Sequence, residues 1–136
     1  MQGKHLYEYA VIRLVPRVER EEFFNVGIIL FSKRAKYIKA LYKVDEDKLN
    51  LFSSELDRES LFANLHVFDK ICSGTKEGGP IAALDIPERF RWLTAVRSAS
   101  IQTSRPHPGF SDDLDRTLEM CIRDRFNTPV VPLQWF

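Results

Sequence analysis

The sequence predicts an α+β fold in which an antiparallel sheet of three to four strands, arranged as a meander, carries helices packed on one side. Aromatic and β-branched residues alternate in the first third of the chain, which is typical of strands. Apolar residues at helical spacing follow, behind residues that cap helices. The links between the expected strands are short, which favours antiparallel pairing.

The first two strands are expected over residues 6–15 and 24–31, separated by a charged connection, residues 17–22. Both runs are apolar at successive positions, so each strand would present apolar side chains on both faces, as central strands do. Asn25 and Gly27, at the start of the second run, indicate a turn or a bulge.

A third strand is expected over residues 37–44, after a polar turn. Here Lys39 and Lys43 alternate with the apolar Ala40 and Tyr42, which predicts a half-exposed strand. These lysines, with Lys33, Arg34 and Lys36, form the most basic stretch of the chain. Solubility explains this stretch better than nucleic-acid binding, because acidic residues elsewhere balance it.

Two helices are expected in the middle of the chain. Asp57 can cap the first, which Gly74 ends, and its apolar stripe is Leu61, Leu65, Phe68 and Cys72. Asp85 and Glu88 form a capping box for the second helix, which should end near Arg97.

Residues 99–104 then read as an extended segment that could return to the sheet, and Pro106, Pro108 and Gly109 should turn the chain. Ser111 is expected to cap a last helix, which Asp112 and Asp113 favour at the positive end of its dipole. Its buried face is predicted to be Leu114, Leu118 and either Cys121 or Ile122.

The length of 136 residues suits one domain, which we place at residues 4–122, with residues 123–136 as an atypical tail. A net charge of +1 argues against an extended nucleic-acid face and leaves a local patch open. The two cysteines, Cys72 and Cys121, lie outside any metal-binding or redox motif and are expected to be buried free thiols. With no signal peptide and no long apolar run, a cytoplasmic location is expected.

Two blocks of the chain, Y-E-Y-A-V-I-R-L-V-P-R-V-E-R-E-E-F-F-N-V-G-I-I-L-F and D-I-P-E-R-F-R-W-L-T-A-V-R-S-A-S-I-Q-T-S-R-P-H-P-G, resemble the bacterial domain-of-unknown-function family 3037. The resemblance covers roughly residues 4–118. It implies a small bacterial cytoplasmic protein without established activity, encoded near kinases that resemble the HipA toxin class. It supplies no catalytic residues.

The chain departs from this family pattern after about Leu118, and residues 130–136 have no amphipathic period. This tail resembles the product of a frameshift or a translated sequencing adapter. The alternative is a genuine apolar tail that docks on the domain or on a partner.

The segment from Ser100 to Phe110 concentrates hydrogen-bonding groups on a backbone constrained by two prolines. Arg105 could clamp a carboxylate or a phosphate, and His107 could add a titratable donor. Gln102 and Ser104 could orient a ligand. The alternative is structural: the segment makes a rigid exit from a strand, and its polar groups cap backbone.

Arg91 and Trp92 are a second candidate surface, for an anion or a stacked base, although this pattern more often belongs to a solvated helix face with one half-buried aromatic. The three histidines show no metal-ligand spacing, so neither a metal nor a cofactor is expected. No nucleotide-binding or nucleophile motif occurs.

The sequence therefore favours a non-catalytic protein-interaction or regulatory module, with a kinase-like protein as its expected partner and no membrane role. The alternative is a small enzyme or nucleic-acid-processing domain that uses Arg105, His107 and Arg91. A shared concave pocket would favour the second reading, and a flat apolar patch would favour the first.

Overall fold

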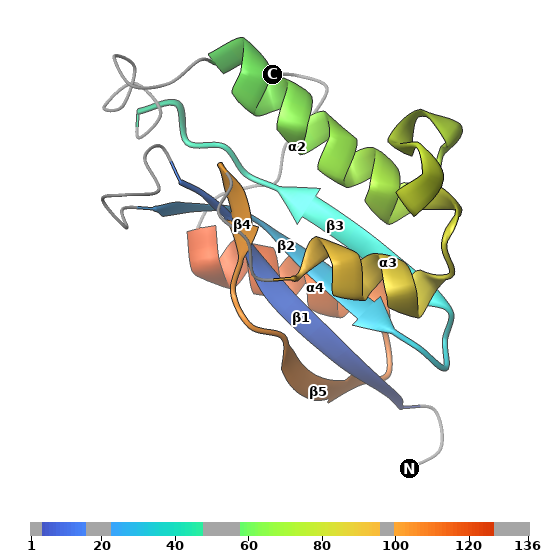
Figure 1. The fold of residues 1–136 in the computed structure, drawn as a ribbon. Helices are drawn as coiled ribbons and strands as arrows, with labels where there is room; N and C mark the ends of the chain where they lie inside the picture. Colours follow the sequence, from blue (N-terminus) through green and yellow to red (C-terminus); the bar gives the residue numbers. More distant parts are fainter. Residues whose placement is uncertain (1–3, 16–22, 48–57, 96–99, 127–136) are drawn as a thin grey trace.

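The alternating apolar run at the start of the chain forms β1 (His5–Leu14), the central strand of a five-stranded sheet (Figure 1). The computed structural model describes residues 4–15, 23–47, 58–95 and 100–126. β1 pairs antiparallel with β2 (Phe24–Ser32), and β2 pairs antiparallel with β3 (Tyr37–Tyr42). The predicted meander and the α+β class are confirmed.

A bulge interrupts the β1–β2 ladder where the sequence indicated one. Ile12 pairs with Gly27 and Arg13 pairs with Asn25, so the register shifts by one residue between them. Gly27 is required here, because a Cβ atom would lie 2.5 Å from the carbonyl oxygen of Leu41 on β3. The bulge keeps Val26 in the core and leaves Asn25 on the opposite face of the sheet.

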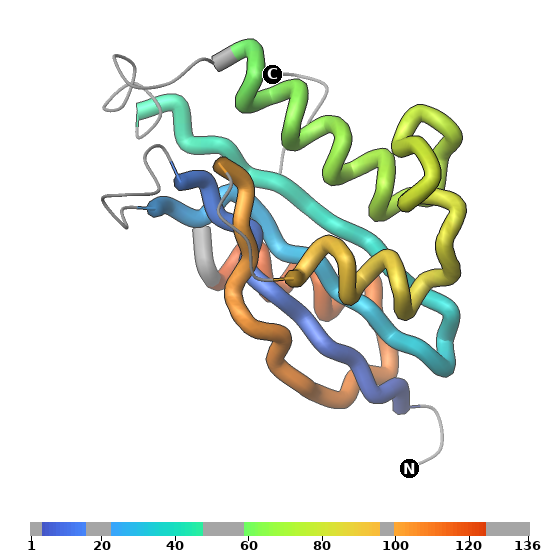
Figure 2. The backbone as a smooth tube through the Cα atoms, viewed as in Figure 1, coloured from blue at the N-terminus to red at the C-terminus, as the bar shows by residue number. Residues whose placement is uncertain are grey.

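Two further strands share the remaining edge of β1. β4 (Ile101–Thr103) pairs with its C-terminal part, and β5 (His107–Ser111) pairs with its N-terminal part. The chain trace shows both strands running along the same side of β1 (Figure 2). The return of the chain to the sheet after Ser100 is therefore confirmed.

The prediction that Pro106, Pro108 and Gly109 turn the chain was wrong for the last two, because both lie inside β5. Pro108 is tolerated because β5 is an edge strand, where a residue without an N–H group can face away from the ladder. Gly109 is required because the ring of Tyr7, its partner on β1, occupies the place where a Cβ atom would stand. A proline and a glycine thus serve strand packing here.

One face of the sheet is covered by α2 (Arg58–Ser73) and α3 (Ile86–Leu93), joined by two short 3-10 turns, η2 (Lys76–Gly78) and η3 (Pro80–Ala83). The predicted stripe of α2 is buried in this core, and Gly74 adopts a φ of 74° just after the helix. On α3, the ring of Phe90 stacks on Phe31 with centroids 4.6 Å apart.

The expectation that the helices pack on one side was wrong. Figure 1 shows α4 (Leu114–Phe126) behind the sheet, opposite α2 and α3. β1 and β2 are apolar on both faces, so Val11, Ile28 and Leu30 also need a cover. The helix supplies it with Leu114, Leu118 and Ile122, while Cys121 is only partly buried. Burial of each such side chain stabilises the fold by about 1.5–3 kcal/mol.

Two predicted helix ends also differ. The capping box of α3 is present, with Asp85 accepting from the backbone N–H of Glu88, but the helix ends at Leu93 and not near Arg97. Thr94 is the C-cap residue, and both its backbone N–H and its hydroxyl donate to the carbonyl of Phe90. Asp113, rather than Ser111, caps α4, because it accepts from the backbone N–H of Arg116.

Ser111 instead accepts from the backbone N–H of Asp113, so its hydroxyl stabilises the turn that precedes α4.

Three of the expectations lie outside the described residues. They are the charged connection at residues 17–22, the start of the first helix at Asp57 and the tail beyond residue 126. No helix in the described part of the chain is long and apolar enough to cross a bilayer.

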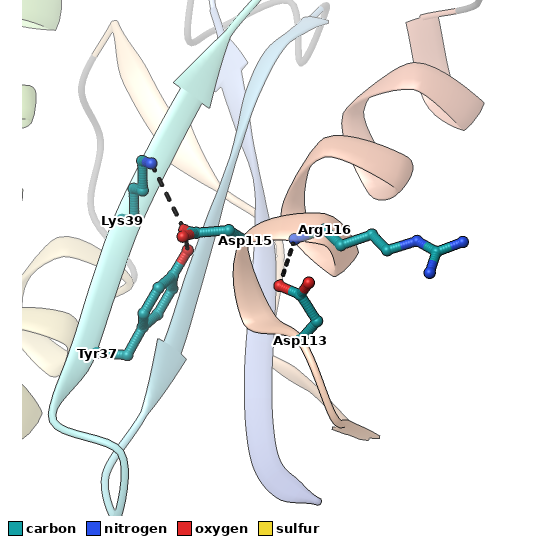
Figure 3. A network of polar contacts seen from close by, with 5 residues as sticks. All are labelled: Tyr37, Lys39, Asp113, Asp115 and Arg116. Atoms are coloured by element: carbon teal, nitrogen blue, oxygen red, sulfur yellow. Dashed lines mark hydrogen bonds and ion pairs between the residues drawn. The ribbon is translucent and has the colours of Figure 1, made fainter.

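A polar network ties α4 to the sheet (Figure 3). The hydroxyl of Tyr37 on β3 donates to Asp115 at 2.7 Å, and Lys39 lies 3.5 Å from the same carboxylate oxygen. The hydrogen bond from Tyr37 holds the pKa of Asp115 below its ordinary value, with a smaller contribution from Lys39. Burial and the same bond raise the pKa of Tyr37, so its hydroxyl stays a donor at neutral pH.

We expect Tyr37→Phe to lower the free energy of unfolding at pH 7 by about 1 kcal/mol or less, since the bond is partly exposed. Because the folded-state pKa of Asp115 is depressed, this stabilisation is present above the ordinary pKa near 3.8 and is lost as pH falls through the lower folded value. Urea unfolding of both proteins from pH 7 to pH 2 should therefore show their difference closing below about pH 4.

Asp115→Asn provides the control for this prediction. In a double-mutant cycle, Tyr37→Phe should cost clearly less in the Asp115→Asn background than in the wild type. A difference between wild type and Tyr37→Phe that persists unchanged down to pH 2 would contradict the assignment.

Candidate functional site

The segment that the sequence singled out forms β4, a short connection and β5. It pairs with the edge of β1 opposite β2. Ser104 fills the gap between the two strands. Its backbone N–H donates to the carbonyl of Val11 at 2.9 Å, and its hydroxyl accepts from the N–H of Val11 at 2.9 Å. The hydroxyl also donates to the carbonyl of Arg105. Ser104 is buried, and its polar atoms serve the sheet.

Arg105 and His107 are exposed on either side of Pro106. Within the described residues, the Arg105 side chain forms no hydrogen bond or ion pair. The ring of His107 packs against Tyr9, its partner on β1, with centroids 5.3 Å apart. Gln102 lies on β4, directly opposite Arg13. A binding role for these residues stays a prediction.

Arg91 and Trp92 lie on α3, and both are exposed. Trp92 forms one wall of a cavity of about 230 Å³ between α2, α3 and the start of β4, and its lining reaches Ser100 and Ile101. Across this cavity, the amide of Asn64 donates to the hydroxyl of Ser100 at 3.3 Å. The structure therefore brings Trp92 to the beginning of the predicted segment.

A second, larger hollow of about 390 Å³ lies at the other end of the sheet. Leu6 on β1 faces Phe110 on β5 directly, and their exposed fractions, 54% and 64%, are the two highest among the exposed large apolar side chains of the described residues. Lys4, His5 and Arg34 complete the lining. Arg91, Arg105 and His107 line neither cavity.

The residues of this hollow were missed in the sequence. Phe110 is the last residue of the segment that the sequence singled out. Because Pro108 and Gly109 are typical of turns, the sequence did not predict the strand β5 that orients the Phe110 side chain. The pairing of Phe110 with Leu6 comes only from the register of β5 against β1, which residues 107–111 do not signal by themselves. Arg34 was assigned to general solubility, and only the fold places it beside Leu6.

The titratable groups give little support to catalysis. Burial, assisted by the nearby charge of Asp69, raises the pKa of the Cys72 thiol to about 12, which keeps it protonated and a poor nucleophile. Asp113 is engaged in capping α4. Within the described residues, no group of three or more His, Cys, Asp or Glu side chains could hold a metal ion.

A family model matches residues 9–124, which include all of β2 to β5, both helices on one face and nearly all of α4. Its description is "Protein of unknown function (DUF3037)". The chain belongs to this family. The resemblance expected from the two sequence blocks is thereby confirmed. Comparisons with curated proteins and with solved structures found no match.

Membership in DUF3037 identifies a domain and no activity, so function must be inferred from the surface of this chain. Among the described residues, the cavities at Trp92 and at Phe110 and the exposed residues around Arg105 stand out on that surface. Ser104, by contrast, belongs to the interior of the domain.

We expect Ser104→Ala to lower the free energy of unfolding by about 1–3 kcal/mol, because it leaves the buried N–H of Val11 without an acceptor. Arg105→Ala, one residue away and exposed, should change it by less than about 0.5 kcal/mol. Chemical denaturation of the two variants checks both values. If Arg105→Ala is as destabilising as Ser104→Ala, its side chain is structural and the proposed binding role for Arg105 should be abandoned.

Proposed function

We propose that this protein is a non-catalytic protein-interaction module of the bacterial cytoplasm, which docks a partner at the hollow around Leu6 and Phe110. The observation that carries the proposal is the pair of exposed apolar side chains, facing each other on a rigid two-stranded edge. Exposed apolar groups that gather in a hollow with charged residues around them are typical of protein-binding surfaces.

The charges around the hollow indicate the kind of partner. Lys4 and Arg34 form no ion pair within the described residues, and both side chains are exposed. Their positive charge favours a partner segment that carries Asp or Glu beside an apolar anchor residue. The anchor would fill the space between Leu6 and Phe110, and the carboxylates would meet the cations at the rim.

A kinase-like protein encoded nearby is the first partner to test, on the strength of the family resemblance alone. No specific observation favours the alternative of a small enzyme or nucleic-acid-processing domain, since Arg105, His107 and Arg91 line neither of the two cavities described above. The positive rim at the hollow is also small, and the chain as a whole is nearly neutral.

The test uses two variants of the hollow, Phe110→Ser and Arg34→Glu, and two matched controls. Met120→Ser removes an exposed apolar side chain from α4, and Lys33→Glu reverses the charge next to Arg34 without touching the hollow. Binding of the purified kinase-like protein would be titrated by calorimetry at two salt concentrations, and the melting temperature of each variant would be measured alongside.

We expect each hollow variant to weaken binding at least about tenfold, with the melting temperature nearly unchanged, because both side chains are exposed. The controls should bind like the wild type, and added salt should weaken the wild-type complex. Equal loss in controls and hollow variants would contradict the assignment. Light scattering decides whether a second copy of this chain occupies the hollow instead.

A further inference from the structure

Arg13 is a partly buried arginine without an anionic partner among the residues that the structure describes. It lies on β1 between Ile12 and Leu14, which point into the core beneath α2 and α3, so its own side chain leaves from the α4 face of the sheet. Its Nε atom is buried and forms no hydrogen bond. Within the described residues, its guanidinium forms no ion pair and lies 4.3 Å above the ring of Phe23.

This situation is unfavourable for the folded chain alone. A buried N–H donor that has lost water and gained no acceptor destabilises the fold, and native proteins leave few such groups. Stacking on Phe23 steadies the plane of the guanidinium, but an aromatic face does not replace an acceptor in the plane of Nε. The geometry therefore suits an acceptor that the described part of the chain does not provide.

The neighbours of Arg13 fit that role. Asn25 on β2 and Gln102 on β4 stand directly opposite Arg13 on its two sides, so the three side chains leave from the same face of adjacent strands. The bulge in the ladder is what gives Asn25 this position. The row places two amides beside one guanidinium and includes no carboxylate that would repel an anion.

We propose that the row Asn25–Arg13–Gln102 is an oxyanion-binding site, which takes the carboxylate or phosphate group of a small ligand. The forked donors of Arg13 match two oxygens of such a group, and the amide N–H groups of Asn25 beside it can donate to the same oxygens. The site is independent of the hollow at Leu6 and Phe110, which lies at the other end of β1 on the opposite face.

The experiment observes Arg13 directly. The Nε–Hε resonance of Arg13 in the full chain labelled with ¹⁵N would be followed by NMR while sodium phosphate or sodium acetate is added, with sodium chloride at the same ionic strength as reference. We expect a saturable shift with at least one of the two oxyanions and none with chloride. A shift with phosphate alone indicates a phosphate ligand, and a shift with acetate alone indicates a carboxylate ligand.

Three variants test the assignment, with binding followed through backbone resonances of β1. Arg13→Met should abolish the saturable shift, and Arg13→Lys, which keeps the charge but loses the fork, should weaken it at least about tenfold. Gln102→Ala should weaken it to a smaller degree. The matched control is Arg116→Met, which removes an exposed arginine on α4 and should leave the affinity unchanged.

Thermal melting separates a binding role from a structural one. Without the oxyanion, Arg13→Met should melt at the same temperature as the wild type or higher, because it removes an unpaired buried donor. The responding oxyanion should raise the melting temperature of the wild type only. The proposal is overturned if neither oxyanion changes the wild-type protein, or if the wild type and Arg13→Met respond equally to the oxyanions. A lower melting temperature for Arg13→Met in addition would show that Arg13 is structural.

Discussion

The burial of β1 on both faces is the constraint on which the rest of the structure depends. Ala10, Ile12 and Leu14 require a cover on one side and Val11 requires one on the other, so helices must flank the sheet on both faces. A strand buried in this way must also pair along both edges, because unpaired backbone groups in the interior are costly. β2 pairs with one edge, and β4 and β5 divide the other between them. Ser104 closes the break between those two strands, since its hydroxyl accepts the N–H of Val11 in place of a backbone carbonyl.

The same constraint makes the position of Arg13 unusual. An arginine on a central strand could be satisfied by a carboxylate on a neighbouring strand, which would produce an ordinary structural ion pair. Here the two neighbours are amides, and the guanidinium stacks on the face of Phe23. The chain thus retains a group that weakens its own stability at a point where the backbone is paired with strands on both sides. Such a combination is expected of a binding residue, because a rigid scaffold keeps the donors in place for the ligand.

Local signals predicted the parts of the fold in which one segment decides its own structure. The period-2 runs gave β1, β2 and β3, the apolar stripe ending at Gly74 gave α2, and the pair Asp85 and Glu88 gave the start of α3. Features that depend on a distant segment were missed. Pro108 and Gly109 look like a turn until Tyr7 and a free sheet edge are known, and α4 could be assigned to a face only once the second apolar face of the sheet needed a cover. For the candidate sites, the sequence singled out the segment from Ser100 to Phe110, whose binding role stays a prediction. Leu6, Arg34 and Asn25 gain their place in the proposed sites only from cross-strand register.

The edge strand β5 also limits how a partner can bind. An exposed edge offers backbone groups to which a foreign strand could add. Pro108 removes one N–H donor from this edge, and β5 is only five residues long, so strand addition would gain few hydrogen bonds here. A partner at this end of the sheet must therefore draw its affinity from side chains. In the complex proposed above, Phe110 and Leu6 would provide the apolar contact, and Lys4 and Arg34 would select the charge of the segment that reaches the hollow. Pro108 thus protects the edge from non-specific pairing, while Phe110, two residues further on, presents its ring to solvent from the same strand.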